Sequence, residues 1–339
     1  MHSLPEIIYI DEGRKTEIQE FLDEWFDTAE TVQANSSGST GSPKKIVLQK
    51  KYMIASAKNT IAYFELLPGQ SIYLCLSTAT IAGKMMLVRA IVGQLKLVIG
   101  PISSDSLLHC TLPIDFTAIV PLQLEQALKV DPKRLNTFGK VLVGGAPLSD
   151  QLMNKIIAAK LRIYQSFGMT ETMSHVAIRT INEFNILIYK ALNNITFSLN
   201  LSEELIIHAP ELGLPELKTN DIVDLHSPTS FTWLGRSDFI INSGGKKISP
   251  ERIEKKLSQL IDLPFYIYGI PDQTLGSKAV LIVESSTEFP LDKAKLTQLL
   301  EKYELPKAII RIEQFIRTES NKIDRHLTYL CPHVAETVF

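Results

Sequence analysis

The stretch VLVGGAPLSDQLMNKIIAAKLRIYQSFGMTET, residues 141–172, carries the pattern that decides the fold. Residues 141–143 are a short β-rich run, residues 149–159 have the apolar spacing of an amphipathic helix, and residues 162–166 are β-rich again. A strand, a helix and a second strand in succession are typical of a layered α/β domain. Gly144-Gly145 stands at the first junction, where an ordinary strand-to-helix turn is one interpretation.

The same alternation extends through the first part of the chain, and the pattern then changes twice. Helical patterns occur at 15–26 and 51–64, and β-rich runs occur at 71–76, 95–99 and 116–120. Residues 185–234 show strands without long helices, and the rest alternates strands (239–242, 265–270, 279–283, 308–312) with helices (250–260, 292–302). We therefore expect an α/β protein: a layered α/β/α N-terminal domain with a β-rich subdomain packed on it, residues 1–236, and a small mobile α+β C-terminal domain, residues 237–339.

The composition argues against several classes of function. Of 339 residues, 45% are hydrophobic, and 35 basic against 37 acidic residues give a net charge of -2. Without a basic excess or a long apolar run, we expect no nucleic-acid binding and no membrane insertion. The three cysteines form no CxxC or Cys/His cluster, so we expect neither a disulfide framework nor a structural zinc site. The N-terminus has no signal-peptide pattern, which predicts a cytoplasmic protein.

A hydroxyl-rich loop, SSGSTGSPK, occupies residues 36–44. Its glycines allow tight turns, its hydroxyls and amides offer donors, and Lys44 adds a positive charge, a combination that suits a phosphate chain. Pro43 stands where the Walker sequence GxxxxGK requires glycine, so the loop is not a P-loop. Taken alone, this loop is interpreted equally well as a flexible Ser/Gly linker.

Three later segments join this loop in a family resemblance: QSFGMTET at 165–172, GRSDFIINSGGKKISP at 235–250 and RTESNKIDR at 317–325. In this order, the four segments resemble the signatures of the adenylate-forming enzymes, which include acyl- and aryl-CoA ligases, luciferases and peptide-synthetase adenylation domains. The resemblance covers nearly the whole chain. It implies that a carboxylic acid is activated with ATP as an acyl-adenylate and then joined to a thiol, with coenzyme A as the expected co-substrate.

The resemblance implies roles for individual residues of a nucleotide site. Thr170 would contact the α-phosphate, Glu171 would hold Mg2+, and Asp221 would bind the ribose hydroxyls. The hydroxyl-rich loop would enclose the β- and γ-phosphates, and the adenine would lie between a glycine turn and an aromatic ring. The predicted ATP-binding residues are Ser36, Ser37, Gly38, Ser39, Thr40, Gly41, Lys44, Gly144, Gly145, Ala146, Pro147, Phe167, Gly168, Met169, Asp221 and Arg236.

Lys322 is implied as the catalytic lysine, acting with Thr170 and Glu171. Its ammonium would neutralise charge on the phosphoryl oxygens during adenylation. The C-terminal domain would then turn about a hinge at Asp238, so that Gly244 and Gly245 meet the thiol of coenzyme A.

The sequence departs from the family pattern in three places. Asn321 stands where glycine usually precedes the catalytic lysine, and Thr219-Asn220-Asp221 replaces the usual TGD. The phosphate loop begins at residue 36, earlier than in most relatives, which predicts a truncated first subdomain.

The segment IAGKMMLVR, residues 81–89, narrows the resemblance to one branch. A small–Gly pair with a basic residue six positions after the glycine is similar to the acid-site helix of the o-succinylbenzoate–CoA ligases of menaquinone biosynthesis. That acid has two carboxylates; one reacts, and the other needs a cationic partner, best met by a guanidinium. The predicted acid-site residues are Gly83, Lys84, Arg89, Ser174 and His175.

Several alternatives stay open at this point. Lys84 and Arg89 fit snorkelling at a helix surface as well, and His175 fits a satisfied structural role. The protein is a CoA ligase for o-succinylbenzoate, a CoA ligase for another aryl or small acid, or a non-catalytic nucleotide-binding relative. A homodimer is also left open. The presence together of Lys44, Thr170, Glu171, Asp221 and Lys322 favours an enzyme that uses ATP, Mg2+ and coenzyme A.

Overall fold

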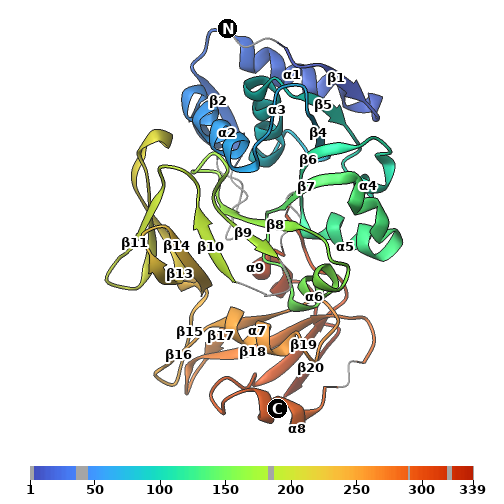
Figure 1. Cartoon of the computed structure of the whole chain (residues 1–339). Helices are drawn as coiled ribbons and strands as arrows, with labels where there is room; N and C mark the ends of the chain where they lie inside the picture. The colour runs from blue at the N-terminus through green and yellow to red at the C-terminus, as the bar shows by residue number, and fades with distance from the viewer. Residues whose placement is uncertain (1–3, 36–44, 182–186, 289–290, 319–322, 339) are drawn as a thin grey trace.

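The computed structural model describes residues 4–35, 45–181, 187–288, 291–318 and 323–338. Within these ranges the chain forms a 12-stranded sheet, a 6-stranded sheet and a two-stranded hairpin (Figure 1). The hairpin consists of β2 (Thr31–Asn35) and β3 (Lys45–Gln49), which pair antiparallel on either side of residues 36–44.

One half of the large sheet is parallel and covered by helices on both faces. Its strands are β1 (Ile7–Tyr9), β4 (Ser71–Leu74), β5 (Lys96–Ile99), β6 (Ile114–Ile119), β7 (Phe138–Val143) and β8 (Ile163–Gly168). Its helices are α1 (Lys15–Phe26), α2 (Lys50–Phe64), α3 (Ile81–Gly93), α4 (Ser106–His109), α5 (Pro121–Val130) and α6 (Asp150–Ala158). The strand order is β1-β5-β4-β6-β7-β8, with every neighbouring pair parallel.

Alternation along the strands divides the core into two halves. Ile72 and Leu74 of β4 belong to the cluster formed with α1, α2 and α3, whereas Tyr73 belongs to the cluster formed with α4, α5 and α6. Figure 1 shows the two groups of helices on opposite sides of the sheet. The predicted α/β/α layering is confirmed.

Local sequence signals start the helices that lie beside the site. The Thr80 hydroxyl accepts a hydrogen bond from the Gly83 amide at the start of α3, and the Ser149 hydroxyl accepts one from the Leu152 amide at the start of α6. Pro121 stands at the first position of α5, where its missing N–H leaves no helix bond unmade.

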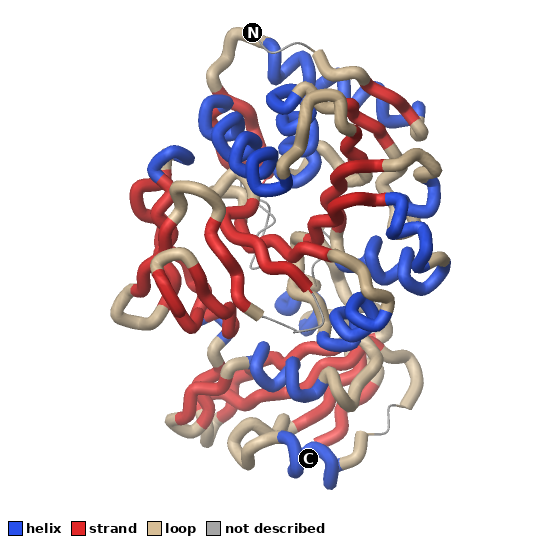
Figure 2. The backbone as a smooth tube through the Cα atoms, in the orientation of Figure 1, coloured by secondary structure: helices blue, strands red, loops and turns tan. Residues whose placement is uncertain are grey.

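The other half of the large sheet is antiparallel. Its strands are β9 (His175–Ile181), β10 (Ile188–Ala191), β11 (Thr196–Leu199), β12 (Glu204–Ala209), β13 (Leu214–Ser227) and β14 (Ser230–Arg236), in the order β9-β10-β14-β13-β12-β11. The β-rich segment is therefore present, but it continues the first sheet through the β8–β9 pair and does not pack on that sheet as a separate layer (Figure 2). This pairing satisfies the backbone groups that β8 would otherwise expose as an edge strand.

The C-terminal part forms the 6-stranded sheet with helices on it. Its strands are β15 (Ile241–Ser243), β16 (Lys246–Ile248), β17 (Phe265–Asp272), β18 (Gly276–Glu284), β19 (Ala308–Ile312) and β20 (Ala335–Val338), and its helices are α7 (Pro250–Leu257), α8 (Lys293–Leu299) and α9 (Arg325–Tyr329). The strand expected at 239–242 begins only at Ile241, because Ser237–Phe239 form a 3-10 turn. Among the helices of the described ranges, none has the length and apolarity to cross a membrane.

Candidate active site

The predicted site residues of the large sheet gather at one of its edges. Residues 144–147 follow β7, residues 169–174 follow β8, and residues 75–80 follow β4 and lead into α3. Parallel strands bring their carboxyl ends to the same edge, which is where open α/β sheets bind ligands.

Gly144 and Gly145 form the turn after β7. A Cβ atom on Gly144 would stand 2.6 Å from the Ser166 Oγ atom, and Gly145 has a φ of +88°, in the left-handed region. The Gly144 amide donates to the Ile119 carbonyl at 2.9 Å. The positive φ favours glycine at 145, a Cβ atom at 144 would require the Ser166 hydroxyl to move, and the turn is tied to the end of β6.

The turn that leaves β8 is closed by Thr172. The Met169 amide donates to the Thr172 hydroxyl at 3.0 Å, and this hydroxyl lies 2.6 Å from the Ser174 carbonyl oxygen. A Cβ atom on Gly168 would stand 2.2 Å from that same carbonyl, so the chain can fold back here only with glycine. Thr170, which precedes Glu171 in the turn, is buried.

Glu171 is exposed in this turn and offers the carboxylate for the predicted Mg2+. The described residues contain no group of three or more His, Cys, Asp or Glu side chains that could hold a metal ion. Mg2+ is typically held by one or two carboxylates together with substrate phosphates. The exposed Glu171 carboxylate therefore fits a magnesium ion that arrives with a nucleotide.

Phe167 belongs to an aromatic cluster at the end of β8. Its ring centroid lies 5.0 Å from Phe231 and 5.8 Å from Tyr189, and these two rings stack on each other at 5.5 Å. Phe167 itself is half-buried. A partly exposed ring that packs against other rings can stack on a purine base.

Asp221 on β13 is buried and accepts a hydrogen bond from the Trp233 indole nitrogen at 2.8 Å. It lies directly opposite Arg236 in the β13–β14 ladder. Burial raises the pKa of the Asp221 carboxyl, while the Trp233 hydrogen bond and the charge of Arg236 oppose this rise. A carboxylate accepts up to four hydrogen bonds, so Asp221 keeps capacity for the hydroxyls of a ribose.

The linker between the two sheets is held by Arg236 and Phe239. Two hydrogen bonds, 2.9 and 2.7 Å long, join the Arg236 guanidinium to the Asp238 carboxylate. Burial opposes the effect of this pair, but the guanidinium still lowers the pKa of Asp238. The Phe239 ring lies 5.7 Å from the Arg236 cation and 4.9 Å from the Arg325 cation of α9. The hinge at Asp238 stays a prediction.

Arg89 on α3 is only 1% exposed, and no acidic side chain of the described residues pairs with it. One terminal nitrogen donates to the Ser174 hydroxyl at 2.7 Å, the other lies 3.6 Å from the Met86 sulfur, and Nε has no hydrogen-bond partner. Burial lowers the pKa of Arg89 to about 9, which leaves the side chain charged at neutral pH. A buried cation without an anion is unfavourable, so the geometry fits a carboxylate ligand.

His175 continues this polar chain. Its Nδ1 atom lies 3.2 Å from the Ser174 hydroxyl, and its Nε2 atom lies 3.1 Å from the Thr60 hydroxyl on α2. Burial, and then the charge of Arg89, lower the pKa of His175 well below its ordinary value, so the ring is neutral. The structure thus brings three predicted acid-site residues together: Arg89 on α3, and Ser174 and His175 just after Thr170 and Glu171.

Lys84 and Gly83 have different surroundings. The Lys84 ammonium pairs with Glu24 at 3.0 Å and lies 4.9 Å from the Phe21 ring, so it faces α1 and not the Arg89 cluster. A Cβ atom on Gly83 would stand 2.1 Å from the Ser77 carbonyl, so this glycine lets α3 pack against the loop after β4. These contacts favour a structural role for both residues over direct contact with the acid.

The comparisons with known proteins identify the family of the chain. The AMP-binding enzyme family matches residues 34–195. A solved structure of an acyl-CoA synthetase (AMP-forming)/AMP-acid ligase II-like protein from Dyadobacter fermentans is 32% identical, covering 94% of this chain and 95% of its own, with a TM-score of 0.63. The chain belongs to the AMP-binding enzyme family.

More distant members of the AMP-binding family match most of the chain. The 2-succinylbenzoate–CoA ligase of Listeria monocytogenes is 24% identical in an alignment of 337 positions, which covers 91% of this chain and 71% of the relative. The o-succinylbenzoate CoA synthetase of Bacillus subtilis, solved with its acyl-adenylate intermediate, is 21% identical with a TM-score of 0.75, covers 87% of this chain and 68% of its own, and shares the fold. The family predicted from the four segments is confirmed.

Several residues predicted for the active site lie outside the large sheet or outside the described residues. Gly244 and Gly245, proposed for coenzyme A, form the exposed turn between β15 and β16, with φ of +56° and +78°. The loop of residues 36–44 and Lys322, the predicted catalytic lysine, lie outside the described residues, so their roles stay predictions.

Sequence reasoning missed four residues that support the site: Thr60, Trp233, Gln165 and Arg179. Thr60 and Trp233 bond to His175 and Asp221 from distant segments, and no local pattern marks either contact. Gln165 stands inside a quoted motif, but its partner Arg179 lies 14 residues further on, as an apparently ordinary residue of a β-rich run. A period-two alignment of the two strands would have been the available signal.

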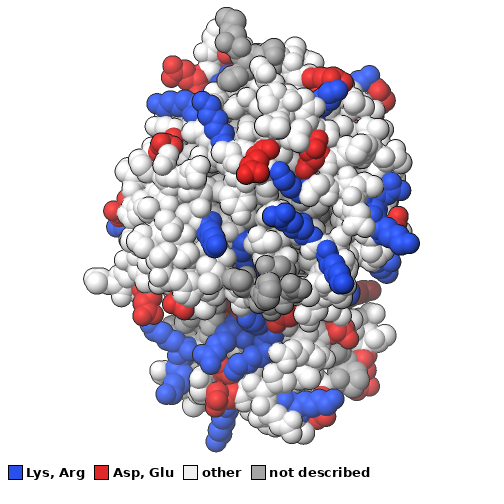
Figure 3. All heavy atoms as spheres, in the orientation of Figure 1, with Lys and Arg blue, Asp and Glu red and all other residues white. Residues whose placement is uncertain are grey.

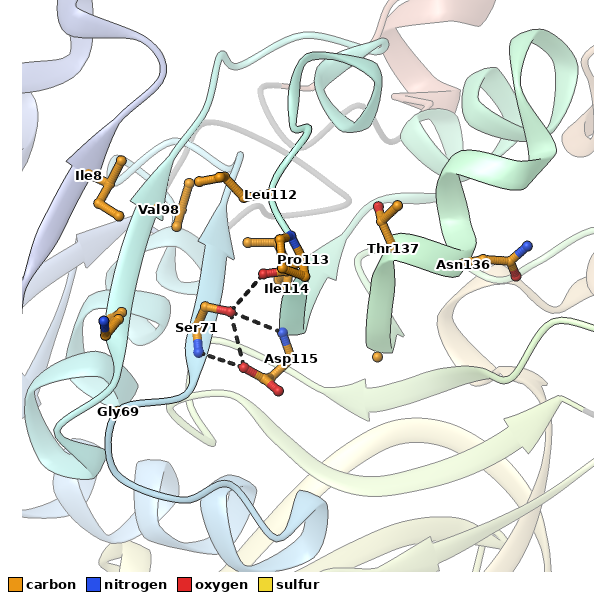
Figure 4. A pocket seen from close by; sticks show the side chains of 12 residues that line it. Ile8, Gly69, Ser71, Val98, Leu112, Pro113, Ile114, Asp115, Asn136 and Thr137 are labelled. Carbon is orange, nitrogen blue, oxygen red and sulfur yellow. Dashed lines mark hydrogen bonds between the residues drawn. The ribbon is translucent and has the colours of Figure 1, made fainter.

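A pocket of about 560 Å3 lies at the opposite edge of the sheet (Figure 4). Ser71 and Asp115 line it near the amino ends of β4 and β6, and the Asp115 carboxylate accepts bonds from the Ser71 amide and hydroxyl at 2.7 and 3.0 Å. This contact ties two strands together. We therefore assign the Ser71–Asp115 contact a structural role, away from the candidate site.

The surface charges are mixed on the face that Figure 3 shows. Most of this face is uncharged, acidic and basic side chains are scattered over it, and a group of basic side chains lies over the upper part of the C-terminal sheet in this view. This distribution agrees with the net charge of -2.

Proposed function

We propose that the protein is an ATP-dependent CoA ligase that converts 2-succinylbenzoate, ATP and coenzyme A to the acyl-CoA, AMP and pyrophosphate through an acyl-adenylate. Family membership supports the adenylation step. The names of the relatives that match most of the chain support the choice of acid.

The single observation that carries this choice is the environment of Arg89. Its guanidinium is buried, keeps one unpartnered nitrogen and bonds Ser174 at the turn beside Glu171. A monocarboxylic acid would present only its reacting carboxylate and would leave this charge uncompensated. A dicarboxylic aryl acid supplies a second carboxylate, which a guanidinium binds with charge-assisted hydrogen bonds.

In the first half-reaction, a carboxylate oxygen of the acid attacks the α-phosphorus of ATP, and pyrophosphate leaves with the electron pair of the broken P–O bond. Thr170 and Lys322 would bind the phosphoryl oxygens on which charge develops. Glu171 would hold Mg2+, which would supply further charge neutralisation. The hydroxyl-rich loop of residues 36–44 would hold the leaving phosphates, and Asp221 and Arg236 the ribose.

In the second half-reaction, the thiol sulfur attacks the acyl carbon, the bond to AMP breaks, and the thiol proton passes to solvent. Residues 1–236 would form the nucleotide-binding domain and residues 237–339 the catalytic lid. The lid would turn about Asp238 and bring Gly244 and Gly245 to the thiol.

The test is pyrophosphate release from ATP and Mg2+ with a panel of acids, with and without coenzyme A. Turnover with 2-succinylbenzoate, acyl-AMP detected by mass spectrometry without coenzyme A, and little turnover with benzoate or a fatty acid would support the proposal. Turnover with benzoate and none with 2-succinylbenzoate would move the assignment to another aryl acid. No pyrophosphate with any acid would overturn the ligase activity.

A further inference from the structure

Arg179 lies in a row of cross-strand neighbours behind the predicted adenine site. Gln165 on β8 is its direct partner in the β8–β9 ladder, and Tyr189 is the direct partner of Phe231 in the β10–β14 ladder. The β9–β10 register places Tyr189 beside Arg179. Side chains of directly opposed residues point to the same face of a sheet, so the four residues form one continuous row.

The Arg179 side chain is 9% exposed, and its contacts with other described residues are with uncharged groups. Its Nε and one terminal nitrogen donate to the Gln165 side-chain oxygen at 2.8 and 2.6 Å, and this terminal nitrogen lies 3.4 Å from the Met153 sulfur. The cation lies 5.2 Å from the centre of the Tyr189 ring. The Arg179 guanidinium thus contacts both Gln165 and Tyr189.

The first contact fixes which way the Gln165 amide points. A guanidinium has donors only, so the oxygen of the amide must face Arg179. The amide nitrogen is then turned the other way, where it lies 3.5 Å from the Ala146 carbonyl in the turn after β7. Arg179 therefore acts on the glycine turn through Gln165.

The second contact, between Arg179 and the Tyr189 ring, affects the aromatic wall of the predicted adenine site. A cation over the face of a tyrosine ring is attracted by the ring quadrupole, more strongly when both are buried. The Tyr189 ring held in this way is tilted against Phe167, with centroids 5.8 Å apart. Phe167 is the ring expected to stack on the base.

We propose that Arg179 is a positioning residue of the adenine site. It holds the Ala146 turn through Gln165 and the Phe167 ring through Tyr189, so that the two walls of the adenine slot keep a constant separation. Arg179 does not touch the nucleotide in this arrangement. The inference deepens the proposed function and rests on it, because the adenine site is part of that proposal.

The experiment compares AMP binding by titration calorimetry and the KM values for ATP and for the acid in four proteins: wild type, Arg179→Met, Arg179→Lys and Arg162→Met. Arg162→Met is the matched control, because Arg162 also lies over a tyrosine ring, Tyr164, at 5.7 Å, but is exposed. We expect Arg179→Met to weaken AMP binding and raise the KM for ATP about tenfold, which corresponds to the loss of a charged hydrogen bond. The KM for the acid should stay within about twofold, and Arg179→Lys should restore part of the loss because its charge is retained.

A second variant covers the case in which Arg179→Met does not fold. Gln165→Glu keeps the acceptor for Arg179 but removes the donor to Ala146, so it should fold and still bind AMP more weakly. Wild-type AMP affinity in Gln165→Glu, or in a folded Arg179→Met, would overturn the positioning role while the proposed function stands. If the wild-type protein itself binds no adenine nucleotide, the proposed function and this inference both fail.

Discussion

Replacing Arg89 by methionine should make the unliganded protein more stable. Burial lowers the pKa of Arg89 from its ordinary value to about 9, which corresponds to about 5 kcal/mol of penalty on the charged form. The substitution also removes the 2.7 Å hydrogen bond to Ser174, worth about 1.5–3 kcal/mol. Methionine has similar length and no charge, so we expect a net gain of about 2 kcal/mol and a Tm higher by about 4 °C.

The same substitution should damage the acid site. Without the guanidinium, the second carboxylate of 2-succinylbenzoate would lose a charge-assisted contact worth about 3 kcal/mol, which raises its KM about 100-fold. The KM for ATP should change little, because the described hydrogen bonds of Arg89 go to the side chains of Ser174 and Met86, and not to Thr170 or Glu171. Calorimetric melting curves and steady-state kinetics with pyrophosphate detection measure both effects.

Arg134→Met is the matched control for this experiment. Arg134 is the other described residue whose buried Nε has no hydrogen-bond partner, but it lies in the turn of residues 132–137, which packs on the opposite face of the sheet from Arg89. Its replacement should leave both KM values unchanged. A lower Tm together with an unchanged KM for 2-succinylbenzoate in Arg89→Met would refute the assignment, because Arg89 would then be a structural residue.

Three further predictions concern the nucleotide site, the neutral histidine and the lysine. Because burial raises the pKa of Asp221, its negative charge destabilises the folded protein above the unfolded pKa of about 3.9. Asp221→Asn should therefore raise the Tm at pH 7, and this gain should become smaller toward pH 4. The same variant should bind AMP about tenfold more weakly in calorimetry. His175 has a lowered pKa, so the stability it contributes is complete above about pH 6.5 and decreases as the pH falls below that value; the melting temperature of His175→Gln should depend less on pH between 7 and 5, and parallel curves would contradict this. Lys322→Ala should abolish acyl-AMP formation but leave thioester formation from preformed acyl-AMP largely intact, and equal loss of both half-reactions in stopped assays would reject its assigned role.

Local hydrophobic patterns were sufficient to predict most of the helices and strands. The helix expected at 15–26 is α1 with the same bounds, and the strand expected at 308–312 is β19. The strand expected at 239–242 starts late, because the Arg236–Asp238 contact favours a 3-10 turn that periodicity does not register. The predicted β-rich subdomain is present, but its strands continue the first sheet through the β8–β9 pair, which local patterns do not show.

The sequence by itself determined the family and the chemical identity of the site residues. The four segments occur in the family's order, and the glycines at 145 and 168 meet backbone requirements that are local: a positive φ and a close approach within a turn. These requirements can be read from neighbouring residues, and the family match confirms the conclusion.

Only the tertiary structure decided how the charged residues are used. Arg89 and Lys84 lie five positions apart on one helix, yet one is buried beside Ser174 and the other pairs with Glu24. Arg179 became part of the candidate site through its strand partner Gln165. Burial and pairing depend on which distant segments pack around a side chain, and the free energy of a charge depends on exactly those neighbours, so a linear pattern cannot assign them.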